Sequence, residues 1–148
     1  MVADMAGSSE KFKIVLKPVT AEAVPSGDAV KVTTGGVQID VYPEREAGGP
    51  ERGLTPLGLL AASLASCEVL MSRLVGRMLG YNGFDVRVAV TADVQVAEGL
   101  RSLSIRYVFK GVDIDTANLI VSKVKELCPV YNSLVRNGVS VEENVEVE

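Results

Sequence analysis

Alternating apolar and polar residues mark three short stretches in the first third of this chain. Residues 11–17, 29–33 and 37–41 each carry apolar side chains at every second position, which is the period of a half-buried β-strand. Gly35 and Gly36 lie between the second and third stretches, where a hairpin turn favours residues that tolerate positive φ. The sequence therefore predicts an N-terminal antiparallel β-meander.

A longer apolar period, of three to four residues, begins at Pro56 and continues to Gly80. Thr55 is a suitable N-cap, and proline is favoured at the first helical position because its missing N–H has no partner there. Residues 43–56, before this helix, are rich in glycine, proline and charge, so we expect them to form a surface loop. The predicted helix has short side chains beside its apolar stripe, which leave room for another backbone. The stripe consists of Leu60, Leu64, Cys67, Met71, Leu74 and Met78.

The C-terminal half begins with a second pair of alternating stretches. Residues 86–96 and 103–109 predict another β-hairpin. A helical period follows, for which Asp113 or Asp115 is the candidate N-cap. We expect this helix to end at Cys128, because the residue before a proline is pushed out of the α region.

Two further elements complete the α+β fold that this order of elements predicts. A short helix over residues 130–136 places Cys128 at a helix N-terminus. Imperfect alternation with acidic residues over 139–148 indicates a final edge strand. We expect residues 11–148 to form a single domain, since they suffice to bury a core, and residues 1–10, which lack any pattern, to form a flexible tail.

Composition excludes several classes of protein. An apolar fraction of 47% excludes a disordered chain, and a net charge of −4 with scattered basic residues gives no footprint for nucleic acid. The longest apolar stretch, residues 57–70, is interrupted by polar side chains and is too short to cross a bilayer. The first ten residues lack the basic start of a signal peptide. We therefore expect a soluble, cytoplasmic protein with no membrane or nucleic-acid partner.

The two cysteines, Cys67 and Cys128, are the candidate reactive groups. The chain has no histidine, which excludes Ser/His and Cys/His catalysis, and two isolated cysteines cannot by themselves form a tetrahedral zinc site, so we expect no metal and no cofactor. In a reducing compartment such thiols are normally free, and one can attack while the other resolves.

Each cysteine also has a purely structural interpretation. Cys67 lies in the apolar stripe, where it can simply fill the core, and as a nucleophile it needs a cation to stabilise its thiolate. Cys128 adjoins a predicted helix N-terminus, which lowers a thiol pKa, although a Cys-Pro pair can also merely separate two helices.

The sequence resembles a known family in three places. Residues 55–67, TPLGLLAASLASC, resemble the helix-opening motif of the OsmC/Ohr proteins, in which a proline leads into an Ala- and Leu-rich turn that ends at the first cysteine. Residues 83–94 and the triplet at 128–130 are similar to that family in order and spacing, so the likeness covers roughly residues 43–136. Members of this family form intertwined homodimers with active sites at the subunit interface. The resemblance therefore implies an OsmC-like fold and such a dimer.

The same resemblance implies an activity. In characterised branches of the family the first cysteine attacks an organic hydroperoxide, becomes a sulfenic acid and condenses with the second cysteine to a disulfide. A small dithiol or a lipoyl partner then reduces that disulfide. These roles correspond to Cys67 as the peroxidatic and Cys128 as the resolving cysteine. The family's loop arginine, which holds the thiolate, corresponds approximately to Arg45, with Arg52 as a second candidate.

One position departs from the family pattern. The family has a glutamate directly after the motif proline, which positions the arginine, and this chain has Leu57 there. Glu51 and Glu68 are candidates for the missing carboxylate's task, although Glu68 follows Cys67 directly and points about a quarter-turn away from it. Two alternatives to the peroxidase therefore stay open: a non-catalytic protein that binds a small hydrophobic ligand, and a redox-sensing or disulfide oxidoreductase protein.

Overall fold

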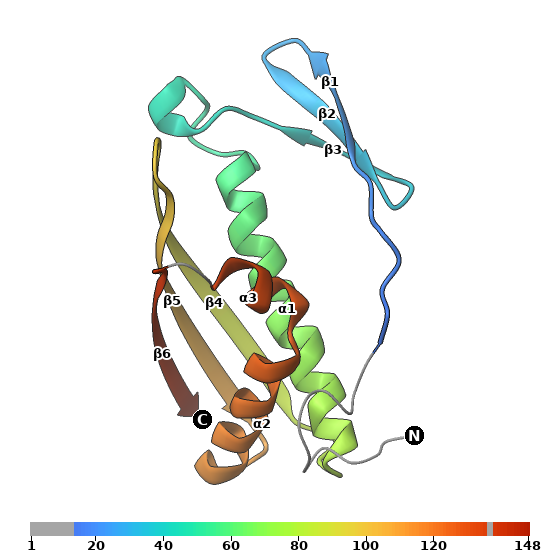
Figure 1. Ribbon diagram of the computed structural model, residues 1–148, viewed down its shortest axis with the longest axis vertical. Helices are drawn as coiled ribbons and strands as arrows, with labels where there is room; N and C mark the ends of the chain where they lie inside the picture. Colours follow the sequence, from blue (N-terminus) through green and yellow to red (C-terminus); the bar gives the residue numbers. More distant parts are fainter. Residues whose placement is uncertain (1–13, 136–137) are drawn as a thin grey trace. The chain divides into compact units, whose positions relative to one another are not determined.

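The computed structural model describes residues 14–135 and 138–148 of the chain, and Figure 1 shows their arrangement into helices and strands. Two compact units are formed, one by Ile14–Leu60 and the other by Ala61–Glu148. In chain order the elements are β1 (Glu22–Ser26), β2 (Ala29–Thr34), β3 (Val37–Val41), a 3₁₀ turn (Arg45–Ala47), α1 (Pro56–Met78), β4 (Asp85–Gln95), β5 (Gly99–Lys110), α2 (Ile114–Leu127), α3 (Pro129–Leu134) and β6 (Ser140–Val147).

The N-terminal unit is a three-stranded antiparallel sheet in the order β1-β2-β3. Gly35 and Gly36 form the turn between β2 and β3 with φ of 58° and 75°, conformations that residues with a Cβ rarely adopt. The predicted meander and its β2–β3 hairpin are therefore confirmed.

The first strand of this meander is not the predicted one. Residues 14–17 form no strand, and Ile14 and Leu16 are 62% and 66% exposed, while residues 11–13 lie outside the described part of the chain. The strand that pairs with β2 is Glu22–Ser26, because a tight turn at Gly27 brings it back along β2. The sequence did not indicate this strand because it contains Pro25, although proline is tolerated in an edge strand.

The C-terminal unit packs helices against one face of a mixed sheet. The strand order is β4-β5-β6, with β4 and β5 antiparallel and β5 and β6 parallel, so the predicted hairpin and final edge strand are confirmed. Alternate residues of β5 share one core cluster with buried residues of α1 and α2, and Figure 1 shows these helices beside the sheet. The buried residues of this cluster on β5 are Leu103, Ile105, Tyr107 and Phe109.

The long helix α1 begins as predicted but buries a different face. The Thr55 hydroxyl accepts a hydrogen bond from the Gly58 N–H at 3.0 Å, which caps the helix. Of the predicted apolar stripe only Leu64 is fully buried, and Cys67, Met71 and Met78 pack at the margin of the core. The buried face consists of Leu64, Glu68, Ser72, Val75 and Gly76. The contact with the sheet, rather than hydrophobicity alone, thus selects the buried face.

The length of α1 bears on the expectation that its apolar stretch is too short to cross a bilayer. The apolar stretch judged too short to cross a bilayer belongs to a helix of 23 residues, whose length and hydropathy alone would suffice to span a membrane. The core helix of a soluble protein meets the same criteria. In this chain α1 contributes Leu64 and Val75 to the core cluster of the C-terminal unit.

The junction between α2 and α3 follows the prediction closely. Asp113, rather than Asp115, is the N-cap of α2, since its side chain accepts a hydrogen bond from the Thr116 N–H. Cys128 ends α2 with φ −72° and ψ 114°, the extended conformation that a following proline favours, and caps α3. The predicted end of the short helix, at 136, lies outside the described residues.

Candidate functional site

The fold brings the sulfur atoms of Cys67 and Cys128 into contact. Cys67 lies on α1 and Cys128 at the α2–α3 junction, 61 positions later, and their Sγ atoms are 2.9 Å apart. Both are free thiols, and the Cys128 thiol donates a hydrogen bond to the Cys67 sulfur. A disulfide bond is about 2.0 Å long, so about 1 Å of movement separates these thiols from a covalent bond.

The two thiols differ in their surroundings. Cys67 is partly exposed, whereas Cys128 is fully buried. The Tyr131 N–H donates to the Cys128 sulfur at 3.4 Å, as expected of a residue that caps a helix. Burial nevertheless dominates and raises the pKa of Cys128 well above its ordinary value, and the hydrogen bond to Cys67 raises it further. The helix N-terminus does lower the pKa of Cys128 through the Tyr131 N–H, as expected, but burial outweighs this lowering.

A buried carboxyl group, Glu68, lies beside this pair. Its side chain is fully buried, and its Oε1 accepts a hydrogen bond from the hydroxyl of Tyr107 on β5. Its Oε2 has no hydrogen-bond partner among the described residues. Burial raises the pKa of Glu68, while the Tyr107 hydroxyl and the Cys128 thiol lower it in part, because both favour the ionised carboxylate.

Sequence reasoning considered Glu68 only as a substitute for the missing family glutamate. The structure pairs it with a tyrosine instead of an arginine. The signal that could have identified it is a charged residue within an otherwise apolar stretch of a helix, because such a group is retained only where a partner satisfies it. Glu68 lies four residues after Leu64 and therefore on the same helix face, which the structure buries.

A salt bridge between Lys125 and Glu143 acts on Glu68 through its charges. Lys125 of α2 and Glu143 of β6 are 2.9 Å apart, and Lys125 is the only described residue that forms an ion pair with Glu143. The parallel register pairs Glu143 with Ile105 and therefore turns it toward the helices. Both groups influence the pKa of Glu68 through their charges, which places them in the same electrostatic environment.

The predicted arginine, Arg45, belongs to the N-terminal unit. It is exposed and forms an ion pair with Glu51 at 2.9 Å. No described residue forms an ion pair with Arg52, the second candidate. At the position of the missing glutamate, the Leu57 N–H donates a hydrogen bond to the Glu44 carboxylate at 2.8 Å. The contact between Arg45 and Cys67 stays a prediction.

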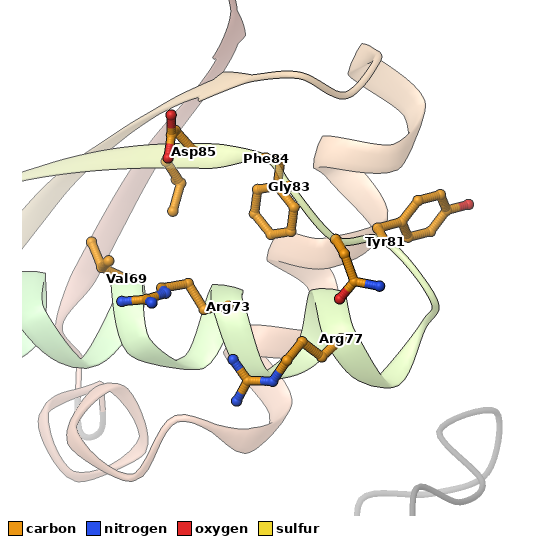
Figure 2. A pocket seen from close by; sticks show the side chains of 9 residues that line it. Val69, Arg73, Arg77, Tyr81, Gly83, Phe84 and Asp85 are labelled. Atoms are coloured by element: carbon orange, nitrogen blue, oxygen red, sulfur yellow. The ribbon is translucent and has the colours of Figure 1, made fainter.

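A cavity of about 530 Å³ lies beside the C-terminal half of α1, and neither cysteine lines it. Figure 2 shows Arg73 and Arg77 extending from successive turns of α1, with the Phe84 ring near the start of β4. Sequence reasoning did not single out these arginines. The residues that line the cavity are Val69, Arg73, Arg77, Tyr81, Asn82, Gly83, Phe84, Asp85 and Val86.

Comparison with known proteins gives a family match and several structural matches. A family model, OsmC, described as OsmC-like protein, matches residues 48–144. No curated protein sequence matches this chain.

Several solved structures share the fold. An organic hydroperoxide resistance protein from Elizabethkingia anophelis matches with a TM-score of 0.73 at 21% identity, over 90% of this chain and 99% of that one. An organic hydroperoxide resistance protein OsmC from Legionella pneumophila matches at 0.69 and 24% identity, with 90% and 99% coverage. OhrB of Bacillus subtilis, also an organic hydroperoxide resistance protein, matches at 0.62 and 20%, with 90% and 100% coverage. At such low identities the likeness shows the α+β fold alone.

Proposed function

This chain belongs to the OsmC-like protein family, as the resemblance of its helix-opening motif predicted, and we propose that it is a cysteine-based peroxidase that reduces organic hydroperoxides. The contact between the Cys67 and Cys128 sulfurs is the observation that carries this proposal. It joins an accessible thiol to a buried one, the arrangement that a peroxidatic and a resolving cysteine require. The names of the structural neighbours, which refer to organic hydroperoxide resistance, support the same substrate class.

The proposed reaction has two steps in this site. The Cys67 thiolate attacks the terminal oxygen of the hydroperoxide, so that the O–O bond breaks, the alcohol leaves and Cys67 becomes a sulfenic acid. Cys128 then attacks the Cys67 sulfur, water leaves and a disulfide forms. An external dithiol, of lipoyl type in the family, restores both thiols by exchange. The partial exposure of Cys67 and the burial of Cys128 support this assignment of roles.

Arg45 is the proposed cation for the Cys67 thiolate. Its guanidinium is already held by a carboxylate, Glu51, within the loop before α1. Glu51 thus takes the part of the family glutamate that Leu57 replaces, and of the two candidates it is the one that pairs with an arginine. Because the Arg45–Glu51 ion pair is solvent-exposed, it should add little to the stability of the fold. We assign Glu51 the role of positioning the Arg45 guanidinium.

A homodimer is part of the proposal. Leu70 of α1 is 61% exposed in the single chain, and the short side chains Ala62, Ser63 and Ser66 lie exposed on its first turns. Ile14, Val15, Leu16 and Val19, which follow one another closely in the chain, are also exposed, and apolar side chains gathered in this way favour a second copy as the partner. Sedimentation equilibrium should give about twice the chain mass of 15.7 kDa. A monomer at micromolar concentration would contradict this assembly.

The peroxidase is tested with reduced protein and cumene hydroperoxide. We expect wild type to consume about one equivalent without reductant and to form the Cys67–Cys128 disulfide, then to turn over when dihydrolipoamide is added. Cys67→Ser should consume no hydroperoxide above the buffer rate, which a ferrous-xylenol orange assay measures. Equal consumption by Cys67→Ser and wild type would exclude the proposed function.

A redox-sensing or disulfide oxidoreductase role is the second candidate. Leu57 in place of the family glutamate favours it, because a less activated Cys67 can still exchange with disulfides. This candidate predicts a reversible Cys67–Cys128 disulfide with little hydroperoxide turnover. The same assay therefore separates it from the peroxidase, and a cytoplasmic location, where thiols are kept reduced, suits both.

A further inference from the structure

The resolving step poses a problem for Cys128. This thiol is fully buried, and burial together with its contacts raises its pKa, so only a minute fraction is thiolate at neutral pH. A protonated thiol is a poor nucleophile, and closing a disulfide requires that its proton leaves. A group within the core must therefore accept that proton.

Glu68 is the carboxyl group placed to do so. It is fully buried, follows Cys67 on α1 and interacts with the Cys128 thiol. Only its Oε1 has a hydrogen-bond donor, the Tyr107 hydroxyl, and Oε2 keeps its acceptor capacity, since no described residue donates to it. A buried carboxyl without full hydrogen bonding costs stability, which suggests that the position serves the chemistry.

The other titratable groups around Glu68 do not suit this task. The Tyr107 hydroxyl on β5 already donates a hydrogen bond to Glu68, and Tyr131 on α3 is a buried phenol. Lys125 on α2 is a cation, and the carboxylate of Glu143 on β6 is held by Lys125. Of the described groups that face Cys128, Glu68 alone is a carboxyl group without a cationic partner.

We propose that the Glu68 carboxylate is the base that takes the Cys128 thiol proton when Cys128 closes the disulfide on modified Cys67, an inference that rests on the proposed peroxidase function. The Cys128 sulfur attacks the Cys67 sulfenic sulfur, the S–S bond forms and the S–O bond breaks. Cys128 is oxidised and the sulfenic sulfur is reduced. The thiol proton passes to Glu68 and from Glu68 to the departing hydroxide, which leaves as water.

A disulfide-exchange experiment tests the base independently of peroxide. Reduced protein is treated with one equivalent of 5,5′-dithiobis(2-nitrobenzoate), which first forms a mixed disulfide with the accessible Cys67. Attack by Cys128 then releases a second nitrothiobenzoate, which stopped-flow absorbance follows. Glu68→Gln keeps the size of the side chain and an oxygen for Tyr107, and circular dichroism confirms its fold. The matched control is Glu143→Gln, which removes a neighbouring carboxylate held by Lys125.

The expected result is a slow second release that depends on pH. At pH 7 Glu68→Gln should resolve about a hundredfold more slowly than wild type, while the first release and the rate of Glu143→Gln stay near the wild-type values. As pH rises, the Glu68→Gln rate should increase about tenfold per unit with the Cys128 thiolate, so that its deficit narrows. A deficit that is equal at every pH, or no deficit, would overturn the inference, since either result indicates a structural role at most.

A second variant and a peroxide arm complete the test. Tyr107→Phe removes a donor that favours ionised Glu68, so the acid-side midpoint of the resolving rate should move to higher pH, and an unchanged midpoint would count against Glu68. With cumene hydroperoxide, Glu68→Gln should accumulate Cys67 sulfenic acid, which dimedone traps. If wild type consumes no hydroperoxide while the exchange arm still depends on Glu68, the peroxidase fails and the base stands.

Discussion

A Cys128→Ser protein exposed to a tenfold excess of cumene hydroperoxide, without reductant, should be over-oxidised at Cys67. Under the proposed function, wild type should stop at the disulfide, because the Cys128 sulfur lies 2.9 Å from the Cys67 sulfur and should capture the sulfenic acid as it forms. Serine cannot form that bond, so a second equivalent of hydroperoxide converts the sulfenic to the sulfinic acid. Intact-protein mass spectrometry should show a gain of about 32 Da in the variant and a loss of about 2 Da in wild type.

The control for this experiment is Cys67→Ser, which should show neither mass change at the same exposure. The outcome distinguishes a resolving cysteine from a merely buried one. If wild type and Cys128→Ser reach the sulfinic acid at equal rates, Cys128 does not resolve, whatever the distance between the sulfurs.

Phe109→Ala should lose about 3 to 5 kcal/mol of unfolding free energy, the usual cost of removing a large buried ring. Phe109 is fully buried on β5, and its ring centroid lies 5.9 Å from that of Phe84 at the start of β4. The substitution leaves a cavity between these strands and the helices that cover them. Against a typical total of about 5 to 15 kcal/mol, such a loss brings the protein close to unfolding at room temperature.

Guanidinium chloride denaturation at one fixed protein concentration measures this loss. Val96→Ala is the matched control, because Val96 lies fully exposed after β4 and should change the free energy by less than about 0.5 kcal/mol. Similar losses for both variants would mean that Phe109 does not contribute to the core as its burial indicates.

The sequence predicted those features that depend on neighbouring residues. Three such features are confirmed: the cap at Thr55, the turn at Gly35 and Gly36, and the end of α2 at Cys128. Each follows from local backbone sterics or from a hydrogen bond within a few residues. The predicted position of the first strand was wrong, because strand pairing does not depend on the periodicity of the strand alone. Residues 11–17 have the period of a strand, but pairing with β2 is decided by the tight turn at Gly27.

In the candidate site, too, residue types could be read from the sequence, whereas contacts between distant residues could not. Cys67 and Cys128 could be singled out by residue type and by the family motif, but the contact between them joins positions 61 residues apart. The sequence named Arg45 and Arg52, and Glu51 and Glu68, only as candidates, and the ion pair of Arg45 with Glu51 could not be predicted from it. Glu68 could not be predicted as buried, because the apolar stripe of α1 indicated another face.

By itself, then, the sequence determined the α+β order of elements and the family, and it singled out the two cysteines as candidate reactive groups. Only the tertiary structure decided how those thiols differ. Cys128 adjoins a helix N-terminus, which favours the thiolate, yet packing removes it from water and raises its pKa. The physical reason is one of range: capping and turn formation act within a few residues, whereas burial depends on how α1, α2 and β5 pack together around Cys128 and Glu68.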